Sequence, residues 1–178
     1  MKKFFIVFAT ILACILLLTS CSDNKITDLR FYVIERSKIS NSMSDGEIVK
    51  ASKNNGRLVF DGDDIDGYNW QNHTVRIKES SITSLGALTE EKGGSAIFKV
   101  DDTYAFVITI KDKLVYYGGF EHGTKNPSVP LQPYIQDIDR FSFKILFDSK
   151  YSDAGDSRSN ESFYSFLNEF GLLSSKSN

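Results

Sequence analysis

Residues 95–120 read SAIFKVDDTYAFVITIKDKLVYYGGF, and this stretch decides the fold. It contains three runs rich in β-branched and aromatic residues, the composition that favours strands. The connections between the runs are too short for crossovers, because parallel strands need a dozen or more connecting residues. The three runs are therefore expected to pair as an antiparallel meander. They are residues 95–100, 105–110 and 114–120, with the connections at 101–103 and 111–113.

Strand-like patterns also occur on both sides of this centre. Residues 141–147 alternate between apolar and polar almost perfectly, which predicts a strand with one face in the core. Residues 74–78 alternate in the same way, and residues 29–34 are β-prone. Residues 47–50 and 57–60 are expected to form a hairpin, because the Asn-Gly pair between them is a strong turn signal.

Helical signals are clearest near the C-terminus. Asn160 is placed as an N-cap, and Gly171 stands where a glycine ends a helix. Between them an apolar stripe follows helical spacing, so this helix is expected to cover one face of the sheet. The stripe consists of Phe163, Phe166, Leu167 and Phe170. Residues 81–90 also have helical spacing, and the acidic residues 61–67 suit the start of a short helix.

These patterns predict an α+β fold: a mainly antiparallel sheet with a central three-strand meander, covered by a C-terminal amphipathic helix and one or two short helices. Residues 37–46 and 121–133 are expected to be loops, the first of them mobile. The length suits one domain. The expected divisions are a signal peptide at 1–20, a tether at 21–27, a single α+β domain at 28–173 and a disordered tail at 174–178.

The first twenty residues have the three parts of a secretory signal: Lys2 and Lys3, an apolar run at 4–18, and small residues before a cut site. The apolar run is short for a bilayer span, which needs about 20 apolar residues. Leu18-Thr19-Ser20-Cys21 resembles the lipobox of bacterial lipoproteins. The resemblance implies cleavage before Cys21 and a lipid on its thiol, with palmitate-like acyl chains that hold the protein in the membrane.

The expected location is therefore the extracytoplasmic side of a bacterial cell membrane, with the membrane itself as the first partner. The alternative is an ordinary signal peptide with a cysteine near its end by accident. Cys14 lies in the apolar run and leaves with it, so Cys21 is the one cysteine of the mature chain and no disulfide is expected.

Charge excludes one class of partner. Removal of residues 1–20 takes away two lysines and no acidic residue, which changes the formal net charge from −2 to −4. A mildly acidic, exported chain without a basic run is not expected to bind nucleic acid. The aromatic content of 13% suits a sheet-rich core.

The segment 64–75, DIDGYNWQNHTV, is the most distinctive in the chain and contains its one tryptophan. Its Asp-Ile, Tyr, Trp and His pattern resembles uncharacterised exported bacterial proteins, a resemblance that implies no activity. Tyr68, Trp70 and His73 are candidates for the rim of a ligand site. The alternative is that Ile65 and the two aromatic residues plug one end of the core while His73 bonds to backbone.

Other groups of polar residues in the sequence give weaker indications of a functional site. Glu121 and His122 could act as an acid and a base, but neighbours in an extended chain point to opposite faces. The acidic residues 61–66 do not follow the calcium-loop pattern. The sequence has no zinc spacing, no Gly-x-Ser-x-Gly motif and no phosphate-binding glycine loop. No metal or cofactor is expected.

The favoured function is a non-enzymatic binding or interaction module of the cell envelope, which takes an envelope protein or a small ligand. Its expected working surface combines residues 68–73 with the loop 121–133. One alternative is a hydrolase acting on envelope material through Glu121, His122 and His73. Another is a structural component of envelope assembly that pairs through a sheet edge.

Overall fold

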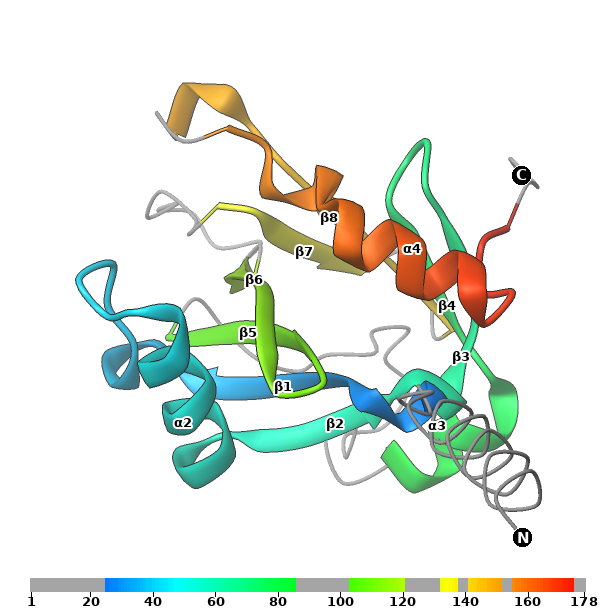
Figure 1. Cartoon of the computed structure of the whole chain (residues 1–178), viewed down its shortest axis with the longest axis horizontal. Coiled ribbons are helices and arrows are strands. Elements are labelled where there is room, and N and C mark those ends of the chain that lie inside the picture. The colour runs from blue at the N-terminus through cyan, green and yellow to red at the C-terminus, as the bar shows by residue number, and fades with distance from the viewer. Residues whose placement is uncertain (1–24, 86–102, 121–131, 138–140, 152–154, 175–178) are drawn as a thin grey trace, which may run out of the picture.

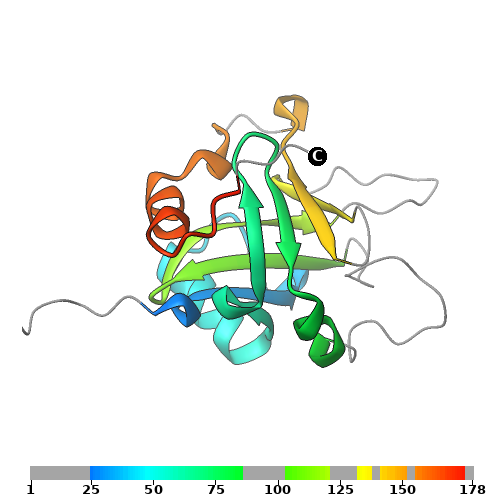
Figure 2. The same ribbon diagram turned by 90° about the vertical axis from the view of Figure 1, so that its right-hand side faces the viewer.

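The computed structural model describes residues 25–85, 103–120, 132–137, 141–151 and 155–174 (Figure 1). These residues have an α+β fold in which one mostly antiparallel, eight-stranded sheet curls into a nearly closed barrel (Figure 2). The strand order is β2-β1-β5-β6-β7-β8-β4-β3. The strands are β1 (Leu29–Glu35), β2 (Arg57–Asp61), β3 (Ile65–Asn69), β4 (Thr74–Ile77), β5 (Tyr104–Ile110), β6 (Lys113–Phe120), β7 (Tyr134–Asp137) and β8 (Ser142–Leu146).

Three helices lie within the described ranges: α2 (Asp45–Asn55), α3 (Glu79–Leu85) and α4 (Glu161–Glu169). Short 3₁₀ turns join many of the elements. They are η1 (Ile26–Asp28), η2 (Arg36–Lys38), η3 (Gly62–Asp64), η4 (Ser149–Tyr151) and η5 (Ser157–Ser159).

The expected antiparallel pairing of residues 105–110 and 114–120 is confirmed as β5 and β6. Lys111 and Asp112 form the two-residue turn between them, with φ of 50° and 60°. Positive φ at both positions matches the twist of a tight hairpin. The Asp112 carboxylate contacts Arg30 on β1 at 3.2 Å and Lys53 on α2 at 2.6 Å, which ties the turn to its neighbours. The first run of the expected meander, 95–100, lies outside the described residues.

The strands expected at 29–34, 57–60, 74–78 and 141–147 are confirmed as β1, β2, β4 and β8. Strands β3 and β7 were not predicted. β7 pairs parallel with β6, in contrast to its antiparallel pairing with β8. The chains of β6 and β7 approach closely at Gly118, where a Cβ atom would overlap the carbonyl oxygen of Pro133.

The hairpin expected from residues 47–50 and 57–60 is wrong, because residues 47–50 belong to α2. Ser44 begins this helix as the first half of a capping box, and its N–H donates to the Glu47 carboxylate at 2.8 Å. Ile48, Val49 and Ser52 then lie buried on one face of the helix. Of residues 37–46, expected to be a mobile loop, 39–44 form a loop, whereas 37–38 belong to η2 and 45–46 to α2.

Apolar side chains form two layers of core. The larger layer fills the inside of the barrel, where the Phe31 ring stacks on Phe60 and Phe106 with centroids 4.4 and 5.5 Å apart. The smaller layer lies outside the sheet, where Ile48 of α2 packs with Ile34 of β1 and other residues. Helix α2 therefore covers the outer face of the β1–β5 region (Figure 1).

The expected C-terminal helix is confirmed as α4, which packs against the barrel core through Phe163, Phe166 and Leu167. The Asn160 side chain accepts a hydrogen bond from the Phe163 N–H at 3.1 Å, as an N-cap does. Gly171 ends the helix with φ of 64°. Helix α3 begins at Glu79, two residues before the expected start at 81, and residues 86–90 lie outside the described ranges.

Two glycines give opposite predictions for stability. Gly171→Ala should lower the free energy of unfolding by roughly 1–2 kcal/mol, because a Cβ is disfavoured at positive φ although space is open around it. Gly46→Ala, in the first turn of α2 with open space around it, should leave stability unchanged or raise it by up to about 1 kcal/mol. Urea unfolding of both variants measures the difference. Equal effects of the two substitutions would contradict the backbone explanation.

Candidate functional site

The turn between β3 and β4 brings three of the predicted site residues together. The Tyr68 side chain is 0% exposed, and its ring lies 5.8 Å from Trp70 and 6.1 Å from His73 between centroids. The Trp70 and His73 rings are 5.7 Å apart. Cys21, Glu121 and His122 lie outside the described residues.

Side-chain hydrogen bonds hold this turn in one conformation. The Asn69 Oδ1 atom accepts from the N–H groups of Gln71 and Asn72 at 3.0 and 3.3 Å. The Asn72 Oδ1 atom accepts from the Thr74 N–H at 3.1 Å. Asn residues bond to backbone groups a few positions on, which stabilises tight turns. His73 closes the turn with φ of 54°, a left-handed conformation.

Tyr68 and His73 form a buried hydrogen bond. The Tyr68 hydroxyl lies 2.9 Å from His73 Nδ1, and the His73 side chain is 8% exposed. Burial raises the pKa of Tyr68 far above its usual range. Burial also lowers the pKa of His73, and the nearby positive charge of Arg158 lowers it further. At neutral pH both partners are therefore uncharged, which suits a bond in the apolar core.

An ion pair from η5 lies beside this bond. Arg158 donates from Nη2 to Asp156 Oδ2 at 2.5 Å and from Nε to Oδ1 at 2.8 Å. Its Nη1 donates to the carbonyl oxygen of Ile145 on β8 at 2.9 Å. The hydrogen bonds from Arg158 hold the pKa of Asp156 below its usual value. The pair is thus anchored to the barrel, and both of its charges affect the pKa of His73.

Tyr116 of β6 completes the buried polar group. Its hydroxyl makes no well-aligned hydrogen bond to any residue that the structure describes. It nevertheless lies close enough to the Tyr68 hydroxyl that Tyr68 adds to the effect of burial, and together they raise the pKa of Tyr116. A buried hydroxyl without a good partner costs free energy, so Tyr116 lowers the stability of the folded state relative to a fully paired group.

The geometry matches most of the core interpretation of this segment. Ile65 and Tyr68 are part of the core, and Trp70 packs against it from a partly exposed position. The expectation that His73 bonds to backbone through its side chain is wrong, since its ring bonds to the Tyr68 hydroxyl. The sequence did not reveal Tyr116, Asp156, Arg158 or Tyr164, whose ring meets Trp70 from α4. No local motif marks them, because a strand, a turn and a helix distant in sequence bring them here.

The acidic residues after β2 act as caps. The Asp61 Oδ1 atom accepts from the Asp63 N–H at 2.8 Å, and the Asp64 Oδ2 atom accepts from the Asp61 N–H at 3.0 Å. These bonds begin η3, as the sequence predicted for a short helix start. Across the described ranges, no group of three histidine, cysteine or acidic residues is placed to hold a metal ion.

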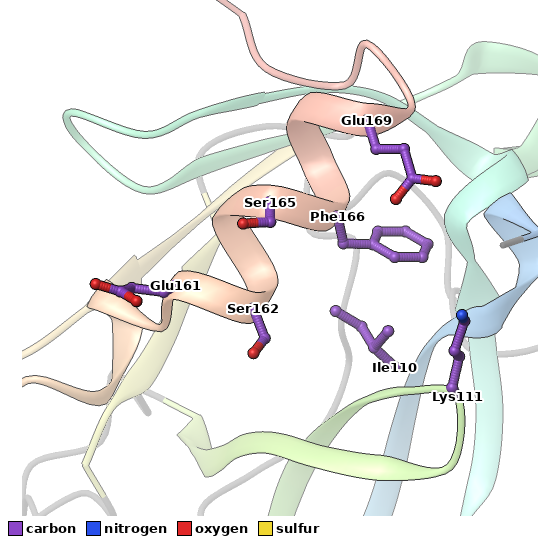
Figure 3. A pocket seen from close by; sticks show the side chains of 7 residues that line it. All are labelled: Ile110, Lys111, Glu161, Ser162, Ser165, Phe166 and Glu169. Carbon is purple, nitrogen blue, oxygen red and sulfur yellow. The ribbon is translucent and has the colours of Figure 1, made fainter. Parts of the chain in front are cut away.

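Described residues line shallow hollows on the surface, two of which lie near elements of the site. The first is an open groove of about 410 Å³ between α4 and the β5–β6 turn, where Phe166 and Ile110 provide apolar surface (Figure 3). In this view the side chains of Lys111 and Glu169 both lie at the right-hand end of the groove. Its other lining residues are Glu161, Ser162 and Ser165. The second hollow, of about 390 Å³, lies beside the Arg76–Asp66 ion pair at the start of α3.

Comparison with known proteins adds no function. No family model matches this chain, and no curated protein or solved structure is significantly similar to it. None of the helices among the described residues is both long and apolar enough to span a membrane.

The lowered pKa of His73 predicts a pH dependence of stability. The unfolded chain takes up a proton near pH 6.5, whereas folded His73 does so at a lower pH. Stability from this residue is therefore complete above pH 6.5 and is lost as the pH falls toward the folded pKa, with a slope of up to about 1.4 kcal/mol per pH unit. Urea unfolding between pH 5.5 and 7.5 measures this slope.

His73→Asn should flatten that slope, because asparagine tolerates positive φ and does not titrate. His122→Asn removes the other histidine of the chain and is the matched control, which should keep the slope. A slope that persists unchanged in His73→Asn would show that another group is responsible.

Proposed function

We propose that this protein is a lipid-anchored binding module on the extracytoplasmic side of a bacterial membrane. The anchor is supported by the basic start, the apolar run and the lipobox-like Leu18-Thr19-Ser20-Cys21. Two or more acyl chains on Cys21 would hold the protein stably, because each buried methylene contributes about 0.8 kcal/mol. The binding role is supported by an aromatic surface at the end of the β3–β4 hairpin.

That surface consists of Trp70 and Tyr164, whose rings meet edge to face with centroids 4.9 Å apart. Tyr164 is 43% exposed on α4, and Trp70 is partly exposed in the turn. Among the described residues, Tyr164 and Leu58 are the exposed large hydrophobic side chains, and Leu58 lies apart on β2. Exposed tryptophan and tyrosine often carry binding energy, since they give large contact area at small entropic cost.

The aromatic surface has a rigid base. The Trp70 ring also packs on Phe163 with centroids 6.2 Å apart, and Phe163 belongs to the core. The Asn69 hydrogen bonds hold the turn that carries Trp70. A contact surface that is already ordered loses little entropy when a ligand binds, so this turn is well suited to binding.

The two other hypotheses gain less support. The hydrolase hypothesis uses His73 as a base, but the ring is buried and engaged by Tyr68. The assembly hypothesis uses a free sheet edge, but the chain's own C-terminal segment occupies the edge at Tyr68. The Tyr68 N–H donates to the Leu172 carbonyl at 2.7 Å, and the Ser174 N–H, expected in a disordered tail, donates to the Tyr68 carbonyl at 2.8 Å.

Trp70 is the one tryptophan of the chain, so its fluorescence reports binding directly. Titration with soluble peptidoglycan fragments and with envelope polysaccharides should change its emission for at least one of them. Tyr164→Ala should then weaken binding about tenfold or more, because a hot-spot aromatic contributes roughly 2 kcal/mol. Leu58→Ala removes an equally exposed side chain and should leave the affinity within about twofold.

Two results would contradict the proposal. One is that none of these components changes the Trp70 emission or is retained by the immobilised protein. The other is that Tyr164→Ala and Leu58→Ala weaken binding equally, since the contact would then lie elsewhere.

A further inference from the structure

The chain joins the barrel at one fixed point. The Lys25 N–H donates to Asp28 Oδ2 at 3.0 Å, and the Lys111 N–H donates to the Asp28 carbonyl at 3.1 Å. Ile26 packs against the barrel core, and its carbonyl lies so close to Gly62 that a Cβ there would overlap it. Residues 25–27, expected as part of the tether, are therefore already held between η3 and the β5–β6 turn.

This attachment leaves a short tether to the proposed lipid. Four residue steps separate Cys21 from Lys25. A fully extended chain spans at most about 3.3–3.6 Å per residue, so the tether reaches at most about 14 Å. The end of the barrel formed by η1, η3 and the β5–β6 turn can therefore move only a short distance from the membrane surface.

The aromatic surface lies at the far end of a hairpin that leads away from this attachment. Strand β3 begins at Ile65, directly after η3, and ends at Asn69 next to Trp70. The four residue steps from Ile65 to Asn69 rise about 13 Å at the usual 3.2–3.4 Å per residue. Both views show the β3–β4 turn pointing away from η1 (Figures 1 and 2).

The end of the barrel formed by η1, η3 and the β5–β6 turn, here called the attachment end, has side chains that suit contact with lipid headgroups. Neither of the exposed large hydrophobic residues among the described ranges, Leu58 and Tyr164, belongs to it. It carries exposed charged residues of both signs instead, so nothing described there would insert into the hydrocarbon layer. They are Lys25, Asp63, Lys111, Asp112 and Lys113.

We propose that η1, η3 and the β5–β6 turn face the lipid headgroups, while the β3–β4 turn with Trp70 faces away from the membrane. This orientation rests on the proposed lipidation of Cys21. It places the aromatic surface where envelope components can reach it, about a strand length farther from the bilayer than the attachment point.

Fluorescent labels on introduced cysteines test this orientation in the lipidated protein. The lipid occupies Cys21 and the signal peptide carries Cys14 away, so an introduced cysteine is the one free thiol. Asp63→Cys places a label in η3, and Gln71→Cys places a matched label at an equally exposed position in the β3–β4 turn. The protein is reconstituted in phosphatidylethanolamine–phosphatidylglycerol vesicles with an energy acceptor on the headgroups.

Energy transfer should be clearly higher from position 63 than from position 71, as for a label about 13 Å nearer to the acceptors. If mass spectrometry shows that the lipid is present, but energy transfer from position 63 is equal to or lower than that from position 71, the orientation is wrong and the lipid anchor is unaffected. A parent protein that has a free thiol at Cys21, lacks the lipid mass and does not float with vesicles would overturn the anchor, and the orientation with it. Thermal unfolding of both cysteine variants confirms that each is folded as the parent is.

Discussion

The packing of the Phe163 ring between Tyr68 and Tyr116 is the contact on which the rest of the structure depends. Its centroid lies 5.2 Å from Tyr68 on β3 and 5.9 Å from Tyr116 on β6, both in edge-to-face geometry. These strands are far apart in the sheet order, so Phe163 of α4 connects two strands that do not pair directly. Edge-to-face pairs add about 0.5–1.5 kcal/mol each to the effect of burial.

The same contact positions the candidate site. Phe163 supports the Tyr68 ring, Tyr68 bonds to His73, and the rings of Tyr68, His73 and Phe163 together support Trp70. Tyr164 follows Phe163 on α4 and meets Trp70 from outside. A buried residue of the helix thus fixes the barrel, and its exposed neighbour completes the surface. The aromatic residues of this region therefore contribute both to the packing of the core and to the exposed aromatic surface.

The parts of the fold that were predicted correctly depend on short-range patterns. Helix α4 follows from a cap, a stripe and a glycine within a dozen residues, and β5–β6 follows from two runs joined by a tight turn. Helix α2 was missed because Asn55-Gly56 suggested a hairpin, although the Ser44 and Glu47 capping box was visible in the sequence. Its β-branched residues Ile48 and Val49 strengthened the wrong interpretation.

The contacts that could not be predicted from the sequence are long-range. The parallel pairing of β6 with β7 rests on two residue pairs, Gly119–Tyr134 and Phe120–Ile135, and the four residues of β7 have no strong sequence pattern. The approach of Arg158 to His73, and of Tyr164 to Trp70, depends on how the barrel closes. Sequence alone therefore identified Tyr68, Trp70 and His73 as a group but gave neither the Tyr68–His73 bond nor the residues around it.

The most direct measurement compares Phe163→Ala with Tyr164→Ala by urea unfolding, followed both by Trp70 fluorescence and by far-UV circular dichroism. If the Phe163 contact with β3 and β6 stabilises the barrel, its loss should lower the free energy of unfolding by about 3–5 kcal/mol, with both signals changing together. The exposed Tyr164 should matter by less than about 1 kcal/mol. A loss below about 1 kcal/mol in Phe163→Ala, or a Trp70 transition well before the loss of secondary structure, would show that the barrel does not depend on α4.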